Sequence, residues 1–244
     1  MSVGEPVRAQ KAIANSGLMS RRSAEEAIAS GRVAVDGQTI GLGDRVDVSA
    51  QTVTIDGVPI PLNPELETHL VYKPVGVIST ASDPQGRPVV VDLVAAEHRL
   101  YPVGRLDSES EGLILLTNDG ELANRVTHPR YGITKKYVAV IIGRPSAAQI
   151  RRLAAGVDLD DGPARALSAR IVSRGQHETM IELVMGEGRK REIRRMFESI
   201  GHEVTRLVRT AIGPLSDQSL RPGDSRPLSI EEISRLLGSG KSGA

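Results

Sequence analysis

The spacing of apolar residues predicts two short helices near the start of the chain. Residues 8–16 carry apolar side chains at helical spacing, and Gly17 follows them as a residue that commonly ends a helix. Ser20 can cap a second helix, because its hydroxyl can accept a hydrogen bond from a free backbone N–H, and Gly31 ends that helix. The chain is therefore predicted to begin with a pair of helices.

A change to two-residue periodicity after these helices predicts strands joined by tight turns. Residues 33–40 and 53–60 each set β-rich residues around an Asp-Gly pair. Such a pair favours a two-residue hairpin, since both central positions of that turn need a positive φ. Residues 6–60 are thus predicted to form a compact helix-helix-strand module.

The segment after the module favours a linker. Pro61 and Pro64 lack a backbone N–H and restrict the residues before them, so residues 61–68 are unsuited to a helix or a strand. We place a second domain at residues 69–237. Residues 238–244 are mostly glycine and serine, and we expect them to form a disordered tail.

The second domain is predicted to be of the α+β class, because short strands and helices intermix without the regular alternation of a doubly wound sheet. Strands are expected at residues 69–72, 112–117, 135–143, 178–185 and 203–208. Helices are expected at residues 120–127, 146–155, 189–200 and 229–237. In the third strand, a two-residue period places Tyr137 on the face opposite Val138 and Val140.

Composition narrows the chemistry that the chain can perform. It contains no cysteine and five scattered histidines, which excludes disulfides and thiolate nucleophiles and disfavours a metal cluster. We therefore expect no metal site. The sequence lacks a long apolar run and a secretory signal pattern, so we expect a cytoplasmic protein with no membrane partner.

Positive charge is concentrated in two segments, although the net charge is only +1. Residues 8–32 have an excess of three basic side chains, and residues 189–209 have an excess of four. Such clusters suit contacts with phosphates. Solvated helix faces are the commoner meaning of charge runs, and the charge pattern alone leaves both interpretations open.

Asp107 is the first candidate for chemistry. It lies in the polar part of residues 104–120, directly before an apolar strand, and loops of this kind often carry function on a rigid scaffold. Aspartate also favours turns and helix caps, because its side chain bonds to the local backbone. From the residues alone, the turn interpretation is the more frequent one.

A second candidate segment begins at Gly186 and predicts a basic helix with an apolar stripe. The stripe consists of Ile193, Met196, Phe197 and Ile200. At about 100° per residue, Arg191 and Arg195 lie opposite the stripe, whereas Arg194 lies on its flank. Arg194 could therefore hold a carboxylate in a cleft. Periodicity by itself favours a wholly exposed basic helix.

Three motifs now carry a resemblance to a known family. They are Gly104-Arg105-Leu106-Asp107 with Glu111-Gly112-Leu113 and Thr117-Asn118-Asp119-Gly120; Lys136-Tyr137; and Gly188-Arg189 to Arg195-Met196 with Gly201, Leu207, Arg209 and Gly213. In this order they resemble the bacterial ribosomal RNA pseudouridine synthases of the RsuA and RluB type. The similarity extends along nearly the whole chain, and the N-terminal module resembles the RNA-binding module named after the fourth small-subunit ribosomal protein.

The resemblance implies a fold and a set of site residues. It implies a mixed, mainly antiparallel sheet, with Asp107 as the catalytic carboxylate acting on the ribose, Arg194 as its cationic partner and Tyr137 at the uracil. No cofactor is implied, because the isomerisation involves no net redox change. The implied RNA-binding residues are Lys11, Arg21, Arg22, Arg32, Arg105, Arg189, Lys190, Arg191 and Arg195. The sequence departs from the family pattern at Ala9-Gln10 and at Glu192.

The expected partner is ribosomal RNA or a ribosomal assembly intermediate, bound by a monomer. Residues 73–76 and 83–88 look more like the large-subunit branch of the family, so we lean toward 23S RNA. Two other classes of protein compete with this interpretation. A non-catalytic ribosome-assembly protein would explain the module and the basic segments but not an acid near phosphates, which repel it. A phosphate-binding enzyme is disfavoured because the chain has no Walker loop.

Overall fold

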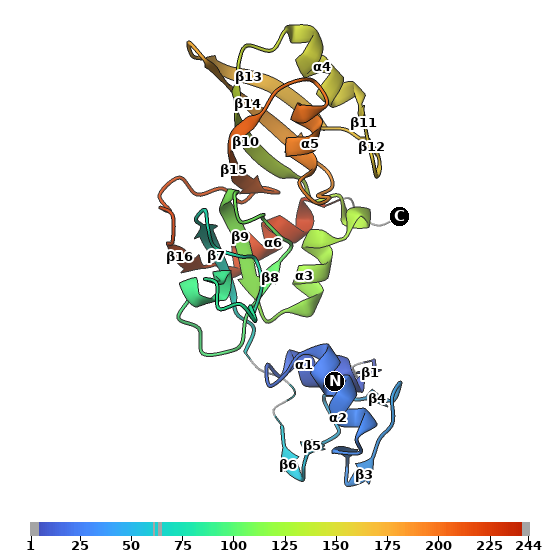
Figure 1. The fold of residues 1–244 in the computed structure, drawn as a ribbon. Helices are drawn as coiled ribbons and strands as arrows, with labels where there is room; N and C mark the ends of the chain where they lie inside the picture. Colours follow the sequence, from blue (N-terminus) through green and yellow to red (C-terminus); the bar gives the residue numbers. More distant parts are fainter. Residues whose placement is uncertain (1–4, 61, 63–64, 241–244) are drawn as a thin grey trace. The chain divides into compact units, whose positions relative to one another are not determined.

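The chain folds into two compact units. The computed structural model describes residues 5–60, 62 and 65–240. The smaller unit contains the chain up to Glu67 together with Ala96–Leu100 and Asn118–Gly120, and the larger unit contains the remainder (Figure 1). The predicted linker at 61–68 and the predicted tail at 238–244 lie partly outside the described residues.

The smaller unit combines two helices with short antiparallel strands. The helices are α1 (Ala9–Asn15) and α2 (Arg21–Ala29), and the strands are β1 (Val7–Arg8), β2 (Val33–Val35), β3 (Gln38–Thr39), β4 (Arg45–Val46), β5 (Val53–Ile55) and β6 (Val58–Pro59). Strands β3, β2, β5 and β6 form one sheet in that order, and β1 pairs with β4.

Local sequence signals account for the boundaries of these elements. The hydroxyl of Ser20 accepts a hydrogen bond from the N–H of Ser23, so the predicted cap is confirmed. Asp56 and Gly57 have φ angles of 51° and 80°, which confirms the tight turn between β5 and β6. The small apolar residues of α1 and α2 pack on the inner faces of β2 and β5 and form the core of the unit.

The larger unit is built on one eight-stranded sheet. Its strands are β7 (Thr68–Lys73), β8 (Tyr101–Val103), β9 (Glu111–Thr117), β10 (Lys135–Ile142), β13 (Ser168–Arg174), β14 (Glu178–Met185), β15 (Val204–Ile212) and β16 (Ser225–Pro227). The order is β13-β14-β10-β15-β9-β7-β16, with β8 also paired to β9. The pair of β9 with β15 is parallel and the other pairs are antiparallel, so the predicted mainly antiparallel α+β fold is confirmed.

Helices and a small hairpin complete the larger unit. They are α3 (Gly120–Thr127), α4 (Ala147–Ala155), α5 (Glu192–Glu198), α6 (Ile230–Gly238), the 3-10 turns η1 (Val90–Leu93) and η2 (Pro129–Tyr131), and the hairpin of β11 (Val157–Leu159) with β12 (Gly162–Ala164). The pattern of the sequence did not predict β8, β13, β16 or this hairpin. Strand β13 lies at an edge of the sheet and is mostly exposed, so it lacks a clear alternation of buried side chains.

Helix α5 begins later than the predicted start at residue 189. Arg191 has a left-handed backbone with a φ of 50°, which a helix cannot continue through. The carboxylate of Glu192 accepts hydrogen bonds at 3.1 Å from both the backbone N–H and the Nε of Arg189. This local contact holds residues 189–191 in a loop, whereas the predicted apolar stripe of the helix is buried as expected.

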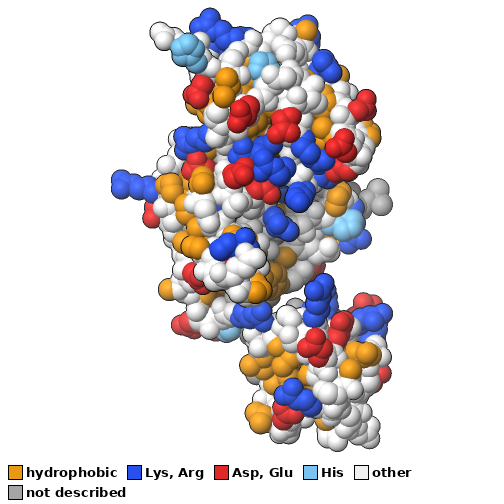
Figure 2. All heavy atoms as spheres, in the orientation of Figure 1, with side chains coloured by type: hydrophobic (Ala, Val, Ile, Leu, Met, Phe, Trp, Pro, Cys, Tyr) orange, Lys and Arg blue, Asp and Glu red, His pale blue; other side chains and the backbone are white. Residues whose placement is uncertain are grey.

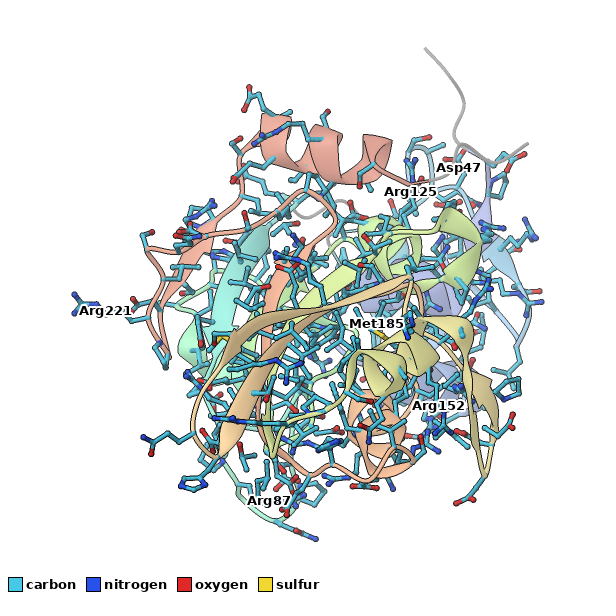
Figure 3. The ribbon with its side chains drawn as sticks, turned by 90° about the horizontal axis from the view of Figure 1, so that it is seen from above. Asp47, Arg87, Arg125, Arg152, Met185 and Arg221 are labelled. Atoms are coloured by element: carbon cyan, nitrogen blue, oxygen red, sulfur yellow. The ribbon has the colours of Figure 1, made fainter. Side chains whose placement is uncertain are left out.

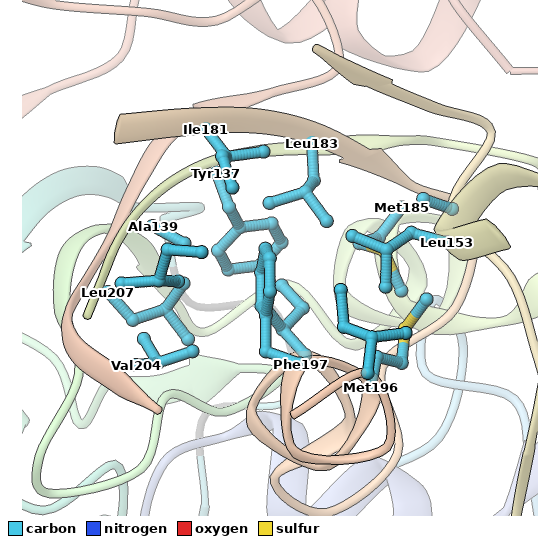
Figure 4. Packing of buried hydrophobic residues seen from close by; sticks show 14 of the residues in the cluster. Tyr137, Ala139, Leu153, Ile181, Leu183, Met185, Met196, Phe197, Val204 and Leu207 are labelled. Carbon is cyan, nitrogen blue, oxygen red and sulfur yellow. The ribbon is translucent and has the colours of Figure 1, made fainter. Parts of the chain in front are cut away.

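Two apolar clusters support the two halves of the sheet. One lies around β10, β14, β15, α4 and α5, where the ring of Tyr137 packs beside Phe197 and near Leu207 (Figure 4). The other joins β7 and β9 to α3 and α6. In Figure 3 Met185 lies near the middle of the view, and Arg221 projects at the margin. Of the residues that the structure describes, none forms a helix long and apolar enough to cross a membrane.

Candidate active site

Asp107 lies in the loop between β8 and β9, and the backbone of this loop is held on both sides of the aspartate. On one side, the hydroxyl of Ser79 donates to the carbonyl of Leu106 at 2.8 Å and accepts from the N–H of the same residue at 3.0 Å. On the other side, the N–H of Gly76 donates to the carbonyl of Ser108 at 2.8 Å. The backbone at Asp107 is therefore fixed by tertiary contacts, as a site on a loop requires.

A cavity of about 440 Å³ opens at this loop. Its wall contains Asp107 and its neighbours, Tyr137 of β10, Met185 of β14, Leu207 of β15 and residues 187–193 before and at the start of α5. The three motifs identified in the sequence thus meet in one cavity. Pockets of this kind, with a few polar groups converging on an apolar wall, are typical of ligand sites.

The carboxylate of Asp107 is half-buried and makes no hydrogen bond or ion pair with any residue that the structure describes. Two cations lie within its electrostatic field. Burial lowers the pKa of Lys73 to about 8, and Asp107 opposes this decrease. The pKa of Arg191 is raised, first by its hydrogen bond to Glu109 and to a smaller extent by Asp107. A free carboxylate in such surroundings can attack an electrophilic carbon or accept a proton.

Tyr137 lines the same cavity but is also a core residue. Its side chain is 8% exposed and belongs to the apolar cluster around β10 and α5, as Figure 4 shows. Val138 and Val140, on the opposite face of the strand, are half-buried, so the predicted alternation is confirmed. The phenol oxygen accepts a hydrogen bond from Nη1 of Arg209 at 3.4 Å. Tyr137 therefore both packs in the core and lines the cavity.

The structure gives Arg194 different partners from the predicted one. Its side chain is 6% exposed and donates to the carbonyl of Val204 at 2.7 Å and to the carbonyl of Glu109 at 3.1 Å. The carboxylate near it is that of Glu109, 3.8 Å from Nε, and not that of Asp107. Helical spacing assigned Arg194 to a flank of the helix, but it could not identify the groups that lie opposite that flank.

Arg209 is a buried arginine that contacts Tyr137 of the cavity wall without lining the cavity itself. It lies on β15, is 4% exposed and donates to the carbonyl of Leu113 as well as to Tyr137. Gly112 makes its position possible. A Cβ at that glycine would lie 2.3 Å from the carbonyl oxygen of Arg209, so any other residue would push β9 and β15 apart.

The basic residues before and within α5 are mostly engaged by carboxylates. Asp161, at the tip of the β11–β12 hairpin, binds Arg189 at 3.0 Å and Arg195 at 2.8 Å. Arg191 binds Glu109 at 2.7 Å. Lys190 has no ion pair with any described residue. Figure 2 shows this mixture as blue and red side chains side by side over the region of α5.

The predicted RNA-binding residues elsewhere have fewer partners. Lys11, Arg21 and Arg22 make no ion pair with any residue in the described part of the chain, and the same holds for Arg105 in the Asp107 loop. Arg32 differs, because its Nε donates to Asp56 at 2.9 Å. Four of these five cations are thus free to contact an anionic ligand.

Several residues of the site were not singled out from the sequence for a role. Lys73 and Arg209 lie in the recognised motifs without a predicted role of their own, and the sequence pattern gives no role to Ser79, Glu109 or Asp161. A signal existed for Arg209, since it interrupts the apolar alternation of β15 on the side that faces the core. The partners of Asp161 and Glu109 come from distant parts of the chain, and no local pattern reports them.

An aspartate without a side-chain partner among the described residues lies in a cavity that is also lined by Arg105 and residues 189–191, an arrangement suited to an enzyme with an anionic substrate. Comparison with family models gives a closer assignment. Residues 67–199 match the family described as RNA pseudouridylate synthase, and residues 7–52 match the S4 domain. The chain belongs to the RNA pseudouridylate synthase family.

Relatives and solved structures agree with this assignment. The chain is 43% identical to ribosomal large subunit pseudouridine synthase B of Bacillus subtilis, over 94% of this chain and 95% of the relative. It is 44% identical to an uncharacterized RNA pseudouridine synthase of Mycobacterium leprae, over 94% and 92% of the two chains. A crystal structure of a pseudouridylate synthase superimposes with a TM-score of 0.67 at 26% identity, over 94% of this chain and 99% of that one.

Proposed function

We propose that this RNA pseudouridine synthase acts on ribosomal RNA and that Asp107 is its catalytic carboxylate. The observation that carries the proposal is the free carboxylate of Asp107 in a cavity shared with Tyr137 and with the loop before α5. A structural aspartate in a turn normally bonds to its local backbone, whereas this side chain has no such partner. The names of the Bacillus subtilis and Pasteurella multocida relatives support the ribosomal substrate.

The reaction requires a group that acts on the ribose. The bond from C1′ to N1 of uracil breaks, the base rotates, and a bond from C1′ to C5 forms; C5 then loses its hydrogen and N1 gains one. Asp107 could attack C1′ directly or assist an elimination that gives a glycal, and both routes use an ionised carboxylate. The cations Lys73 and Arg191 interact electrostatically with Asp107 and bring positive charge to its side of the cavity.

Tyr137 and Arg105 are assigned supporting roles at the base. The phenol of Tyr137 can contact the uracil and move a proton, since it lines the cavity and its ring is held in the core. Arg105 is exposed at the edge of the Asp107 loop and can occupy the space that a displaced base leaves. Extrusion of the target nucleotide is necessary because its sugar is otherwise out of reach.

The large-subunit RNA is the proposed target. The segments 73–76 and 83–88 resemble the large-subunit branch, and the relatives from Bacillus subtilis and Pasteurella multocida are both named ribosomal large subunit pseudouridine synthase B. Mapping pseudouridines in ribosomal RNA from cells with and without the protein tests this target. Loss of a site in 23S RNA is the expected result, and loss in 16S RNA alone would contradict it.

Asp107→Asn tests the catalytic assignment. The change removes one charge from the cavity, so we expect pseudouridine formation to fall at least about 1,000-fold while RNA affinity is retained. Asp158→Asn is a matched control, because Asp158 is an exposed aspartate of β11 in the same unit that is outside the cavity. An Asp107→Asn enzyme with nearly full activity would refute the assignment.

A further inference from the structure

A buried guanidinium without a carboxylate partner is present behind the Asp107 loop. Arg209 is 4% exposed and has no ion pair with any residue that the structure describes. Its Nη2 is buried and has no hydrogen-bond partner among those residues. Arginine cannot lose its proton in a protein, so burial leaves an uncompensated positive charge at this point. Such a costly arrangement calls for an explanation beyond packing.

The contacts of Arg209 link three parts of the site. Its Nε donates to the carbonyl of Leu113 on β9. Its Nη1 lies 3.4 Å from the phenol oxygen of Tyr137 on β10 and 3.5 Å from the carbonyl of Arg105, two residues before Asp107. One rigid planar group thus contacts the strand after the Asp107 loop, the loop itself and the tyrosine of the cavity. The fork geometry of arginine makes these directions specific.

The positive charge of Arg209 also acts on two neighbouring lysines. Arg209 contributes to the lowered pKa of Lys73 and of Lys135, both of which are lowered mainly by burial. Lys73 is also within the field of Asp107. Arg209 therefore belongs to a group of buried cations, and one of them, Lys73, interacts with Asp107. Arg194 is not part of this group, because it contacts the carbonyls of Glu109 and Val204.

We propose that Arg209 is the positioning residue of the Asp107–Tyr137 centre, because its guanidinium joins the Tyr137 phenol to the Asp107 loop. This inference rests on the catalytic assignment of Asp107 proposed above. By donating to the phenol oxygen, Arg209 turns the hydroxyl hydrogen of Tyr137 away from itself and fixes the ring. By contacting the carbonyl of Arg105, it limits displacement of the loop that carries the carboxylate. A small displacement of either group costs rate, because catalysis depends on their geometry.

Kinetics of Arg209→Gln and Arg209→Lys test the proposal. A hydrogen bond from a charged donor contributes enough that its loss lowers kcat by roughly 10- to 100-fold. We expect Arg209→Gln to show this decrease with the KM for RNA changed less than about threefold, since Arg209 is buried and does not bind phosphate. Arg209→Lys keeps the charge and should recover part of kcat.

Lys135→Met is the matched control. Lys135 is another internal cation of the same sheet, and its Nζ donates to the carbonyls of Val126 and Ile133 at 2.8 Å and not to Tyr137. Its pKa is lowered to about 8, mainly by burial, so its removal should perturb folding in a similar way. Thermal unfolding of the variants allows kcat to be compared at equal folded fractions.

A spectroscopic measurement separates this inference from the proposed function. The chain has four tyrosines, so carbon-13 labelling gives few resonances, and Tyr137→Phe identifies that of Tyr137. We expect Arg209→Gln to shift the Tyr137 resonance and Lys135→Met to leave it unchanged, whether or not any RNA is modified. The inference is overturned if Arg209→Gln leaves that resonance unchanged, loses no more kcat than Lys135→Met, or raises KM with kcat unaffected. An inactive wild type with the expected shift would instead count against the proposed function alone.

Discussion

The two basic regions of this molecule differ in how their charges are partnered. In the smaller unit, Lys11, Arg21 and Arg22 are without ion-pair partners in the described residues. In the larger unit, the arginines before and within α5 bind carboxylates of the β11–β12 hairpin and the Asp107 loop. Similar runs of basic residues in the sequence therefore have different physical roles. An unpaired exposed cation can release counterions from RNA, whereas a paired one first has to leave its carboxylate.

The paired arginines have a structural role that the sequence did not indicate. Arg189 donates not only to the carboxylate of Asp161 but also to the carbonyls of Asp161, Gly162 and Pro163, at 3.1, 3.2 and 2.7 Å. It thereby holds the turn of the β11–β12 hairpin against the loop before α5. The basic segment builds one wall of the cavity, and Lys190 is the cation there that lacks a partner in the described chain.

The largest effect on RNA binding is expected from removing the unpaired cations of the smaller unit. The triple change Lys11→Gln, Arg21→Gln and Arg22→Gln should weaken RNA binding by on the order of tenfold or more at ~0.1 M salt, and should reduce the slope of log K against log salt by about 2 to 3. Arg32→Gln is the control, because Arg32 is already paired with Asp56. Filter binding over a series of salt concentrations measures both the RNA affinity and the slope. An unchanged slope in the triple variant would contradict the comparison.

Lys190 and Arg195 form a matched pair within the second region. Lys190→Gln should weaken RNA binding about three- to tenfold and lower the salt slope by about 1, since it removes an unpaired charge. Arg195→Gln should change RNA affinity less than about twofold, because Arg195 is bound to Asp161. The latter should instead lower the free energy of unfolding by roughly 0.5–1 kcal/mol. Equal losses of affinity in the two variants would show that ion pairing does not decide which cations bind RNA.

Asp161→Asn should leave Arg189 and Arg195 without their shared carboxylate and so make them resemble the unpaired cations. It removes the carboxylate that engages Arg189 and Arg195, so RNA affinity should rise about two- to threefold and the salt slope should steepen by up to about 1. Asp158→Asn, which removes an exposed aspartate of the same hairpin, should have a smaller effect. Weaker RNA binding by Asp161→Asn would mean that the carboxylate positions the arginines for RNA instead of competing with it.

The smallest effect on RNA binding is expected from the internal lysines, whose titration appears instead as a pH dependence of stability. Burial lowers the pKa of Lys73 and of Lys135 to about 8, whereas the unfolded chain keeps these lysines protonated up to a pH of about 10.4. Between these values the unfolded state binds more protons, so the contribution of each lysine to the free energy of unfolding rises with pH, by at most about 1.4 kcal/mol per pH unit.

Chemical denaturation from pH 7 to 10 measures this dependence. The difference in unfolding free energy between the wild type and Lys73→Met should grow in favour of the wild type above a pH of about 8 and stay constant below it. Lys135→Met should behave alike. A constant difference over the whole range would mean that these lysines remain protonated in the folded protein.

The sequence by itself determined most of the elements and the location of the loop that carries Asp107. Alternation in β10, the Ser20 cap and the Asp-Gly turns depend on neighbouring residues, so local patterns suffice to predict them. The resemblance of the motifs identified the family before any geometry was known, and comparison with known proteins confirmed it. Local pattern failed at the edge strand β13 and at the start of α5, where exposure and a contact of Glu192 with Arg189 override it.

Only the tertiary structure decided which charges meet. Helical spacing gives the direction in which Arg194 leaves its helix, but its partners at Glu109 and Val204 are brought there by the packing of α5 against the sheet. Arg209 reaches Tyr137 and Arg105 because β15 pairs with both β10 and β9, and Gly112 allows that close approach. Periodicity describes one element at a time, whereas an electrostatic partnership depends on distances between elements that are far apart in the chain.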